Sequence, residues 1–469
     1  MPGVDFDLAI IGAGAGGLTA AAFAAQLGAN VALIEKNRIG GDCTWTGCVP
    51  SKALLKAAKM AHDVRNAGRF GIISAAPVID MVAVRAYVRR AIDEVYQYET
   101  PDELQSKGVE VIQGHARFQD AATILVNRQS VRAKAFLITT GARPRIPAIA
   151  GLSGVPFLTY EQIFDNVQLP GTLVVVGGGP IGMELAQAYQ RLGSHVIVIA
   201  QRLLPKDEPE APALMRRVFE REGVRFVTER ALSARRDGAG VLVATESEEI
   251  RGDALLVASG RVPTVAGLDL DKAGVKYSNA GIPVDDRLRT NVKHIYAAGD
   301  VLGGYQFTHL AGWQSFQAAR NALLPGNSLG LSELVPWVTY TDPEVAHAGM
   351  TEEAARARFG GQIQVRRWDM SRTDRAVCEG DTGGFIKVVA KDDGTLLGAT
   401  VVHPRAGETI AELVLAINHR LKLSDLAAAI HPYPTYVTAV QQLAAEATVE
   451  KLLSGTSGRF VRGLSKWTR

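Results

Sequence analysis

Two stretches of the sequence, residues 7–34 and 173–199, repeat one arrangement: an apolar run, a glycine turn of the form G-x-G-x-x-G, a helix-forming run and a second apolar run. In a strand-turn-helix-strand context, these glycines let a pyrophosphate approach the backbone at a helix N-terminus, where N–H groups and the helix dipole favour anions. The chain is therefore predicted to be an α/β protein with two dinucleotide-binding folds. The glycines concerned are Gly12, Gly14 and Gly17 in the first turn and Gly177, Gly179 and Gly182 in the second.

The two units differ at the position that contacts the ribose. Glu35 ends the second strand of the first unit, where a carboxylate accepts hydrogen bonds from ribose hydroxyls. The spacing from Gly17 to Glu35 is repeated from Gly182 to Ala200, so Ala200 replaces that acid. Loss of the acid removes repulsion toward a 2′-phosphate, and Arg202 is able to pair with one, which favours NADPH over NADH. The alternative is that Arg202 is a solvated loop charge.

The composition is typical of a soluble globular protein, with 469 residues, 47% hydrophobic residues, 21% charged residues and a net charge of +3. This length fits about three domains, and the small net charge argues against nucleic acid as a partner. Residues 8–34 carry no charge, but their glycine cluster and βαβ pattern argue against a membrane span, and the features of a signal peptide are missing. Three cysteines fit a reducing compartment, so we expect a cytoplasmic protein.

Two of those cysteines, Cys43 and Cys48, lie in the run Gly-Gly-Asp-Cys-Thr-Trp-Thr-Gly-Cys-Val-Pro-Ser-Lys, directly after the first dinucleotide unit. Residues 49–51 are predicted to begin a helix, whose N-terminus would favour a thiolate at Cys48. A redox disulfide beside a bound cofactor is the interpretation we favour. A buried pair, a structural disulfide and half a zinc site are the alternatives, although two further zinc ligands at finger spacing are missing.

Later glycine turns mark the borders between domains. Gly141 and Gly260 each follow an apolar strand, and each is expected to close one nucleotide domain and lead to the next. The run of residues 295–300 offers a further strand, followed by Gly299 for close backbone approach and Asp300 as a carboxylate for a ribityl or ribose hydroxyl.

From about Val335 onward, alternating strands and helices predict a mixed α+β domain. The expected strands are residues 385–390 and 396–402, and the expected helices are residues 409–421 and 438–453.

Together, the two dinucleotide folds, the C-x4-C pair and the late Ala-Gly-Asp turn resemble the class I flavin-dependent pyridine nucleotide-disulfide oxidoreductases, over nearly the whole chain. The residues beside and between the two cysteines, Asp42 and residues 44–46, are most similar to those of mercuric reductase-like members. Dihydrolipoamide dehydrogenase and glutathione reductase are other relatives. The resemblance implies two Rossmann-like domains, FAD on the first and NAD(P)H on the second, and a C-terminal interface domain that forms a homodimer. The boundaries expected are 1–148 with 268–335 for the FAD domain, 149–267 for the NAD(P)H domain and 336–469 for the interface domain.

The resemblance also assigns roles to single residues. Cys48 would be the flavin-facing thiol and Cys43 the interchange thiol that meets substrate. Lys52 and Glu184 would form an ion pair beside the flavin nitrogen that accepts hydride, although sequence alone would make them helix surface charges. The groups implied for FAD are Gly12, Gly14, Gly17, Glu35 and Asp300, with the backbone around His309, and those implied for the nicotinamide dinucleotide are Gly177, Gly179 and Gly182.

The family pattern breaks near the C-terminus. In the segment His-Pro-Tyr-Pro-Thr-Tyr-Val-Thr, Tyr433 replaces the acid-base histidine of disulfide-reducing members and Thr438 replaces its glutamate partner. Tyrosine titrates near pH 10 and so shuttles protons poorly at pH 7. Mercuric reductases also carry tyrosine here, but they end in a cysteine pair, whereas residues 463–469 contain no cysteine. His431 is either a substitute base or a structural side chain, and Cys378 receives no role.

The sequence therefore predicts an FAD-dependent, NADPH-preferring oxidoreductase that passes electrons through Cys43 and Cys48 to a metal ion or a small disulfide. It predicts no resident metal. A dihydrolipoamide dehydrogenase-type enzyme is the second interpretation, and it would require another base. A flavoprotein that senses redox state with little turnover is an interpretation from a different class.

Overall fold

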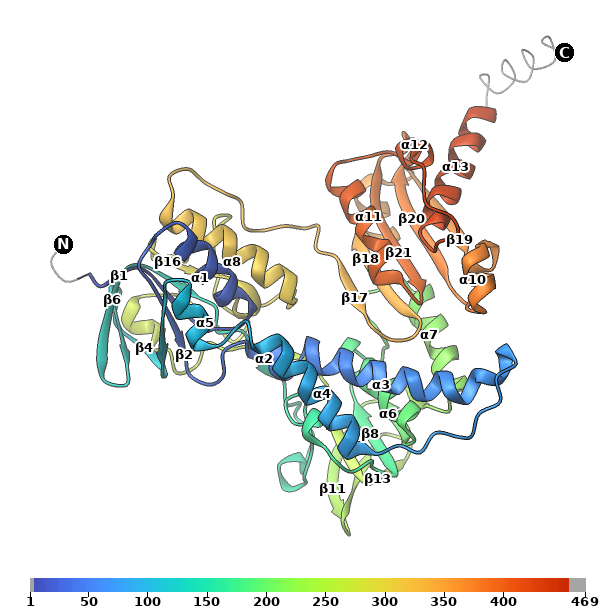
Figure 1. Cartoon of the computed structure of the whole chain (residues 1–469), viewed down its shortest axis with the longest axis horizontal. Coiled ribbons are helices and arrows are strands. Elements are labelled where there is room, and N and C mark those ends of the chain that lie inside the picture. Colours follow the sequence, from blue (N-terminus) through green and yellow to red (C-terminus); the bar gives the residue numbers. More distant parts are fainter. Residues whose placement is uncertain (1–3, 455–469) are drawn as a thin grey trace. The chain divides into compact units, whose positions relative to one another are not determined.

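The computed structural model describes residues 4–454, which fall into two compact units (Figure 1). Unit 1 comprises Met1–Gln201 and Glu222–Ser332, and unit 2 comprises Arg202–Arg221 and Glu333–Arg469. The mixed α/β class predicted from the sequence is confirmed. The three domain boundaries expected above stay a prediction.

A seven-stranded sheet forms the first dinucleotide fold of unit 1. The parallel strands follow the order β3-β2-β1-β6, with β16 also parallel to β6, and β5 and β4 continue the sheet as antiparallel strands. The long β6 allows this branching, because residues 129–132 pair with β5 and residues 133–138 pair with β1. The strands are β1 (Phe6–Ile11), β2 (Val31–Glu35), β3 (Val109–Gln113), β4 (Ala116–Asp120), β5 (Thr123–Val126), β6 (Gln129–Ile138) and β16 (Ile295–Ala297).

Residues 8–11 of the central strand β1 form an apolar run because both faces of the strand are covered. These residues are buried, with Leu8 and Ile10 in one buried cluster and Ala9 and Ile11 in another. Helices α1 (Ala15–Gln26) and α8 (Thr308–Leu323) pack against each other beside this sheet (Figure 1). The strand, glycine turn, helix and strand predicted for residues 7–34 are thus confirmed.

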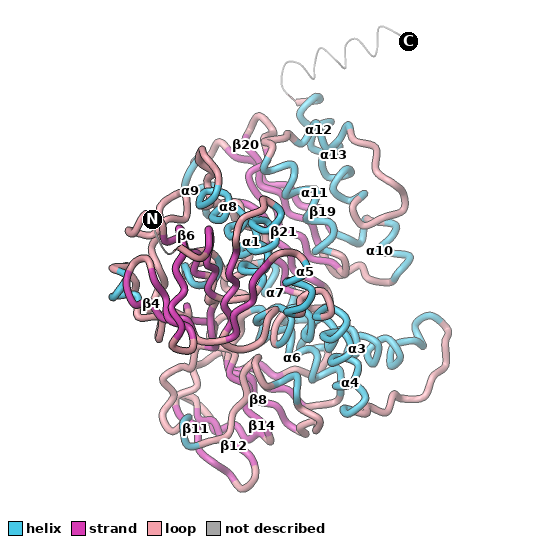
Figure 2. The backbone as a smooth tube through the Cα atoms, turned by 60° about the vertical axis from the view of Figure 1, so that its left-hand side comes forward, coloured by secondary structure: helices cyan, strands magenta, loops and turns pink. Residues whose placement is uncertain are grey.

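The second dinucleotide fold is a four-stranded parallel sheet in the order β10-β9-β8-β14. Figure 2 shows β8 and β14 of this sheet side by side. Its strands are β8 (Thr172–Val176), β9 (His195–Ile199), β10 (Arg225–Val227) and β14 (Ala254–Val257), and α6 (Pro180–Leu192) follows β8. An antiparallel sheet of β11 (Ser233–Asp237), β12 (Gly240–Ala244) and β13 (Glu249–Gly252) and a ribbon of β7 (Ala142–Pro144) and β15 (Arg261–Pro263) complete the strands of unit 1.

Four α-helices lie between strands β2 and β3 along the chain. They are α2 (Gly41–Trp45), α3 (Cys48–Asn66), α4 (Met81–Tyr96) and α5 (Pro101–Ser106). The helix predicted to begin at residues 49–51 is confirmed and starts at Cys48, whereas the short α2 was not predicted.

Unit 2 is built on a five-stranded antiparallel sheet in the order β17-β18-β21-β20-β19. The strands are β17 (Trp337–Thr339), β18 (Glu344–Gly349), β19 (Ile363–Asp369), β20 (Phe385–Lys391) and β21 (Leu396–His403). The helices are α7 (Glu210–Arg221), α9 (Glu352–Phe359), α10 (Asp374–Glu379), α11 (Ala406–Asn418), α12 (Leu423–Ala428) and α13 (Thr438–Leu453). Side chains of β20, β21, α11 and α13 share one buried core.

The predictions for unit 2 are accurate except at one helix. The helix expected over residues 409–421 begins at Ala406 and ends at Asn418. The predicted C-terminal end is wrong because Arg420 adopts a φ of 54°, which lies outside the right-handed helical region. The helix over residues 438–453 is confirmed at both ends. Among the residues that the structure describes, no helix has the length and apolar character needed to cross a membrane.

The second glycine turn gives a matched test of local packing. A Cβ on Gly182 would lie 2.1 Å from the carbonyl oxygen of Gly177, whereas a Cβ on Gly179 would have no neighbour within 4 Å. Gly182→Ala is expected to lower the free energy of unfolding by about 1–3 kcal/mol, because the turn must open. Gly179→Ala should cost only about 0.5 kcal/mol, as an alanine at a helix N-cap. Urea unfolding of both variants tests this, and equal losses would contradict it.

Candidate redox site

The two cysteines of unit 1 lie at the junction of two helices. Cys43 belongs to the short α2, and Cys48 is the first residue of the 19-residue α3. Both are free thiols and they form a hydrogen bond with each other, so the structure shows the reduced form of the pair. The position of Cys48 at a helix N-terminus follows the prediction from sequence, and it favours negative charge on this sulfur.

Three neighbours stabilise that charge. The hydrogen bond from Cys43 has the largest effect and, with the Thr308 hydroxyl and the Lys52 ammonium, lowers the pKa of Cys48 to about 6. The Oγ1 atom of Thr308 lies 3.2 Å from the sulfur of Cys48. The same hydrogen bond and burial raise the pKa of Cys43. At neutral pH, Cys48 is therefore the thiolate and Cys43 the protonated thiol of the reduced pair.

Lys52 and Glu184 form the predicted ion pair. The Nζ atom of Lys52 on α3 lies 2.9 Å from Oε2 of Glu184, which sits in the first half of α6 and is buried. The two residues are 132 positions apart, so the pair connects the cysteine helix with the second dinucleotide fold. The alternative that both are separate surface charges does not describe this geometry.

A half-buried arginine, Arg261, connects the loop that carries the cysteines with Asp300 and Tyr160, and sequence reasoning missed it. Arg261 lies 2.5 Å from Oδ2 of Asp42 and 2.5 Å from Oδ2 of Asp300, and its Nε donates to the hydroxyl of Tyr160 at 3.2 Å. Asp42 precedes Cys43 in α2, so this network fixes the loop that carries the redox pair. Burial raises the pKa of Asp300, and Arg261 opposes that effect. The only signal in the sequence was that Arg261 directly follows the Gly260 turn.

The first glycine turn has the shape that a dinucleotide requires. A Cβ on Gly17 would lie 1.9 Å from the carbonyl oxygen of Gly12, while Gly14 has open space, with its nearest neighbour at 3.9 Å. Helix α1 begins without a side-chain cap and has no acid in its first turn, and α6 begins in the same way. N–H groups left uncapped in a glycine cradle suit the phosphates of FAD and of a nicotinamide dinucleotide.

Other predicted cofactor residues also lie in unit 1, in or beside the two dinucleotide folds. Glu35 accepts hydrogen bonds from the N–H groups of Ala13 and Asn37, at 2.8 and 2.7 Å, so it holds the first glycine turn, and its contact with a ribose stays a prediction. The ring of His309 stacks on Phe307 with centroids 5.4 Å apart, at the start of α8. The turn residues Gly141 and Gly260 adopt φ values of 69° and 107°, which favour glycine, and their strands β7 and β15 pair with each other.

The remaining predicted residues belong to unit 2. Tyr433 is 68% exposed, and its hydroxyl donates to Oδ2 of Asp374 at 2.6 Å. This hydrogen bond raises the pKa of Tyr433 further above neutrality. Thr438 bonds to Thr435 and to the carbonyl of Pro432 and so closes the loop.

His431 is held by acceptors on both sides of its ring. Its Nε2 lies 2.9 Å from Oε1 of Glu412, and its Nδ1 lies 3.1 Å from the carbonyl oxygen of Ala429. With both nitrogens engaged, the ring fixes the loop before Tyr433, which supports the structural interpretation of this histidine. Cys378 is an exposed free thiol, Arg202 is exposed with a hydrogen bond to the carbonyl of Pro205, and residues 463–469 lie outside the described part of the chain.

Residues 6–315 match the family described as pyridine nucleotide-disulphide oxidoreductase, and residues 335–444 match its dimerisation domain. The chain belongs to this family. It is therefore a flavoprotein disulfide oxidoreductase that depends on FAD and a pyridine nucleotide, and it carries the family's dimerisation domain.

Enzymes with two different activities are found among the similar proteins. The chain is 38% identical to a dihydrolipoyl dehydrogenase of Thermus scotoductus, covering 92% of this chain and 95% of the relative. It is 36% identical to a mercuric reductase of Acidithiobacillus ferrooxidans, covering 99% and 84%. Its fold is similar to the Cu(II) complex of the HOCl-induced flavoprotein disulfide reductase RclA from Escherichia coli, with a TM-score of 0.85, 27% identity and coverage of 94% and 99%. Sequence identity therefore leaves the electron acceptor open.

The hydrogen bonds of the two thiols predict how strongly each variant of this oxidoreductase raises the pKa of Cys48. Thr308→Val should raise the pKa of Cys48 above about 6, and Cys43→Ala should raise it further, because the hydrogen bond from Cys43 has the larger effect. The measurement is the pH dependence of Cys48 alkylation in the reduced enzyme, followed by peptide mass spectrometry. Thr46→Val is the matched control, since Thr46 lies in the same loop and bonds to Asp42 instead. An unchanged midpoint in Thr308→Val would refute the assignment.

Proposed function

We propose that this protein uses NADPH to reduce a metal ion at the Cys43–Cys48 pair. The observation that carries the proposal is the division of protons within the pair: Cys48 is the thiolate beside Thr308 and Lys52, and Cys43 keeps its proton. The enzyme is thus prepared to use Cys43 as the group that meets the acceptor.

When bound, FAD would accept hydride from NADPH and pass two electrons to the disulfide. The residues of the chain do the rest. Lys52 and Thr308 stabilise the Cys48 thiolate, and Glu184 holds the Lys52 ammonium in place. A metal ion that binds both sulfurs displaces the proton of Cys43, takes up two electrons, and leaves the disulfide re-formed, so no thiol has to be protonated as a leaving group.

The residue at position 433 supports a metal acceptor over a dithiol substrate. Lipoamide or glutathione chemistry requires a group that exchanges protons near pH 7, whereas hydrogen bonding to Asp374 raises the pKa of Tyr433. His431 is held by Glu412 and by the backbone. The mercuric reductase relatives and the Cu(II) complex of RclA support the same class of acceptor.

Dihydrolipoamide dehydrogenase activity is the second candidate, because a dihydrolipoyl dehydrogenase is among the most similar relatives at 38% identity. It would require a proton route other than Tyr433. A redox sensor with little turnover is the third interpretation. We further propose a homodimer, formed through the dimerisation domain at residues 335–444, in the cytoplasm, because a chain with only three cysteines fits a reducing compartment.

Turnover with a panel of acceptors tests the proposal. NADPH oxidation by the FAD-loaded enzyme is expected to be rapid with Hg(II) plus excess thiol, and slow with lipoamide and oxidised glutathione. Cys43→Ala should retain FAD and its reduction by NADPH but lose transfer to the metal, because the dithiol is incomplete. Cys378→Ala is the control thiol variant and should keep full activity. Fast lipoamide turnover would favour the second candidate, and failure of every acceptor would favour the sensor.

A second variant tests the choice of pyridine nucleotide. Arg202 follows Ala200, the residue at the ribose-binding position of the second fold, and it is exposed. Arg202→Ala is expected to raise the KM for NADPH about tenfold, with little effect on the KM for NADH, since only NADPH carries the 2′-phosphate. Equal effects on both nucleotides, or none, would contradict the role of Arg202.

A further inference from the structure

A connecting segment, residues 202–221, leaves unit 1 and returns to it. It follows β9, the second strand of the second dinucleotide fold, and it belongs to unit 2. Both flanks are fixed in unit 1. Gln201 accepts a hydrogen bond from Arg230 at 2.8 Å, and Glu222 forms a two-point pair with the buried Arg191 at 2.6 and 2.8 Å.

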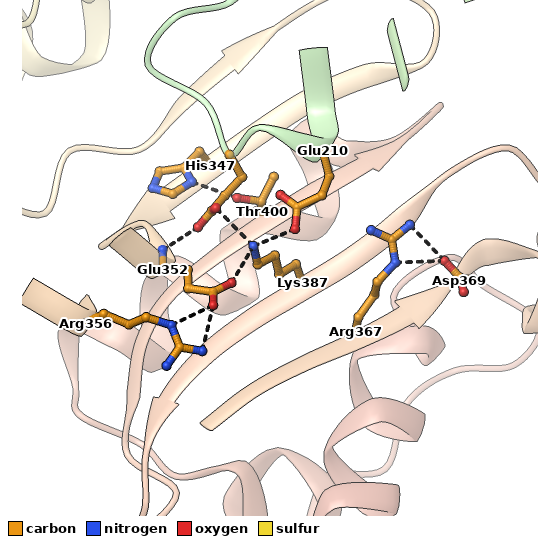
Figure 3. A network of polar contacts seen from close by, with 9 residues as sticks. Glu210, His347, Glu352, Arg356, Arg367, Asp369, Lys387 and Thr400 are labelled. Carbon is orange, nitrogen blue, oxygen red and sulfur yellow. Dashed lines mark hydrogen bonds and ion pairs between the residues drawn. The ribbon is translucent and has the colours of Figure 1, made fainter. Parts of the chain in front are cut away.

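Within unit 2, one buried lysine holds the acidic start of this segment. The Nζ atom of Lys387 on β20 lies 3.0 Å from Glu208 and 2.7 Å from Glu210, both in the connecting segment, and 2.8 Å from Glu352 of α9 (Figure 3). The side chains of Lys387 and Glu208 are only 5% and 4% exposed. In Figure 3 the carboxylates converge on the lysine from the connecting segment and from α9.

The charge balance of this cluster makes the lysine necessary. Three carboxylates surround Lys387, and Glu352 also pairs with a second cation, Arg356 at 2.7 Å. Burial alone would lower the pKa of Lys387, but the carboxylates of Glu210, Glu352 and Glu208 raise it, so the ammonium stays charged. Without this ammonium, the carboxylates of Glu208 and Glu210 would face each other with their countercharge lost, and the segment would move away from β20.

Two further contacts fix the same segment. Asp207 accepts a hydrogen bond from the indole of Trp337 at 2.8 Å, and Glu208 also accepts one from the backbone N–H of Glu352 at 2.5 Å. Helix α7 buries Ala211, Met215 and Phe219 completely. The start of the connecting segment is therefore anchored by ionic and polar contacts within unit 2.

We propose that Lys387 is a positioning residue for the pyridine nucleotide, acting through the connecting segment. By anchoring Glu208 and Glu210, it fixes the path of the chain just after Ala200 to Arg202, the residues at the ribose end of the second fold. This inference rests on the proposed function, in which that fold binds NADPH. A residue of the dimerisation domain thus sets how well the nucleotide is bound, without touching it.

Lys387→Met tests the inference in the full-length, FAD-loaded enzyme. The KM for NADPH and the Kd for NADP⁺, measured by calorimetry, should each rise about tenfold, a change of about 1.4 kcal/mol. The kcat at saturating NADPH should stay unchanged, because a high NADPH concentration compensates for weaker binding. The KM for the acceptor should also stay unchanged, because the acceptor meets Cys43 and not the nucleotide fold. Lys387→Arg, which keeps the charge, should recover most of the affinity.

Arg367→Met is the matched control. Arg367 lies on the neighbouring strand β19, and its partner Asp369 is outside the lysine cluster (Figure 3). This variant should leave the KM for NADPH and the Kd for NADP⁺ unchanged. An equal rise in the control would overturn the proposal, since the effect would then come from general loosening of unit 2.

Trp337→Phe is the milder variant, for the case that Lys387→Met does not fold. It removes the hydrogen bond to Asp207 and keeps an aromatic ring beside His347, so a rise in KM of about threefold is expected. Unchanged nucleotide affinity in variants that retain FAD would overturn the inference. Wild-type enzyme that binds NADP⁺ but reduces no acceptor would instead count against the proposed function alone, while absence of NADP⁺ binding in the wild type would overturn both.

Discussion

The ion pair between Lys52 and Glu184 is the interaction on which the redox site depends. It joins α3, which begins with Cys48, to α6, which begins at the second glycine turn. The thiolate needs a nearby cation, and the cation needs a carboxylate that keeps it in place when the site is shielded from water. One pair therefore links the chemistry of the sulfur to the position of the second dinucleotide fold, and neither helix could shift without changing the environment of Cys48.

The same electrostatic interactions explain why the two thiols of the pair differ in pKa. A shared hydrogen bond cannot lower the pKa of both sulfurs, because one donates and the other accepts. The helix N-terminus, Thr308 and Lys52 all favour charge on Cys48, so the proton stays on Cys43. An acceptor that binds to thiolates can displace this last proton, whereas a disulfide substrate also has to have its leaving thiol protonated. The exposed Tyr433, bonded to Asp374, is poorly suited to that second task.

The sequence predicted those parts of the structure that depend on local patterns. The glycine turns, the strands on either side of them and the helix over residues 438–453 follow from short-range steric and periodic rules, and the Lys52–Glu184 pair came from the family resemblance. Arg261 and the lysine cluster could not be predicted in this way. Asp42 and Arg261 are 219 positions apart, and Glu208 and Lys387 are 179 apart, so neither contact leaves a periodic signal in the sequence. The short α2 was missed because five residues carry too little pattern to identify a helix.

These two long-range contacts share a physical form: a cation that is shielded from solvent, largely for Arg261 and almost fully for Lys387, binds carboxylates from segments that are distant along the chain. Arg261 brings the residue before Cys43 together with Asp300, and Lys387 brings the connecting segment together with α9. Such clusters tolerate little substitution, because removal of the cation leaves several desolvated charges of one sign. They add less to stability than an apolar core of equal size would, so their value lies in specifying geometry. In this oxidoreductase that geometry concerns the redox loop in unit 1 and the start of the connecting segment, residues 202–221, in unit 2.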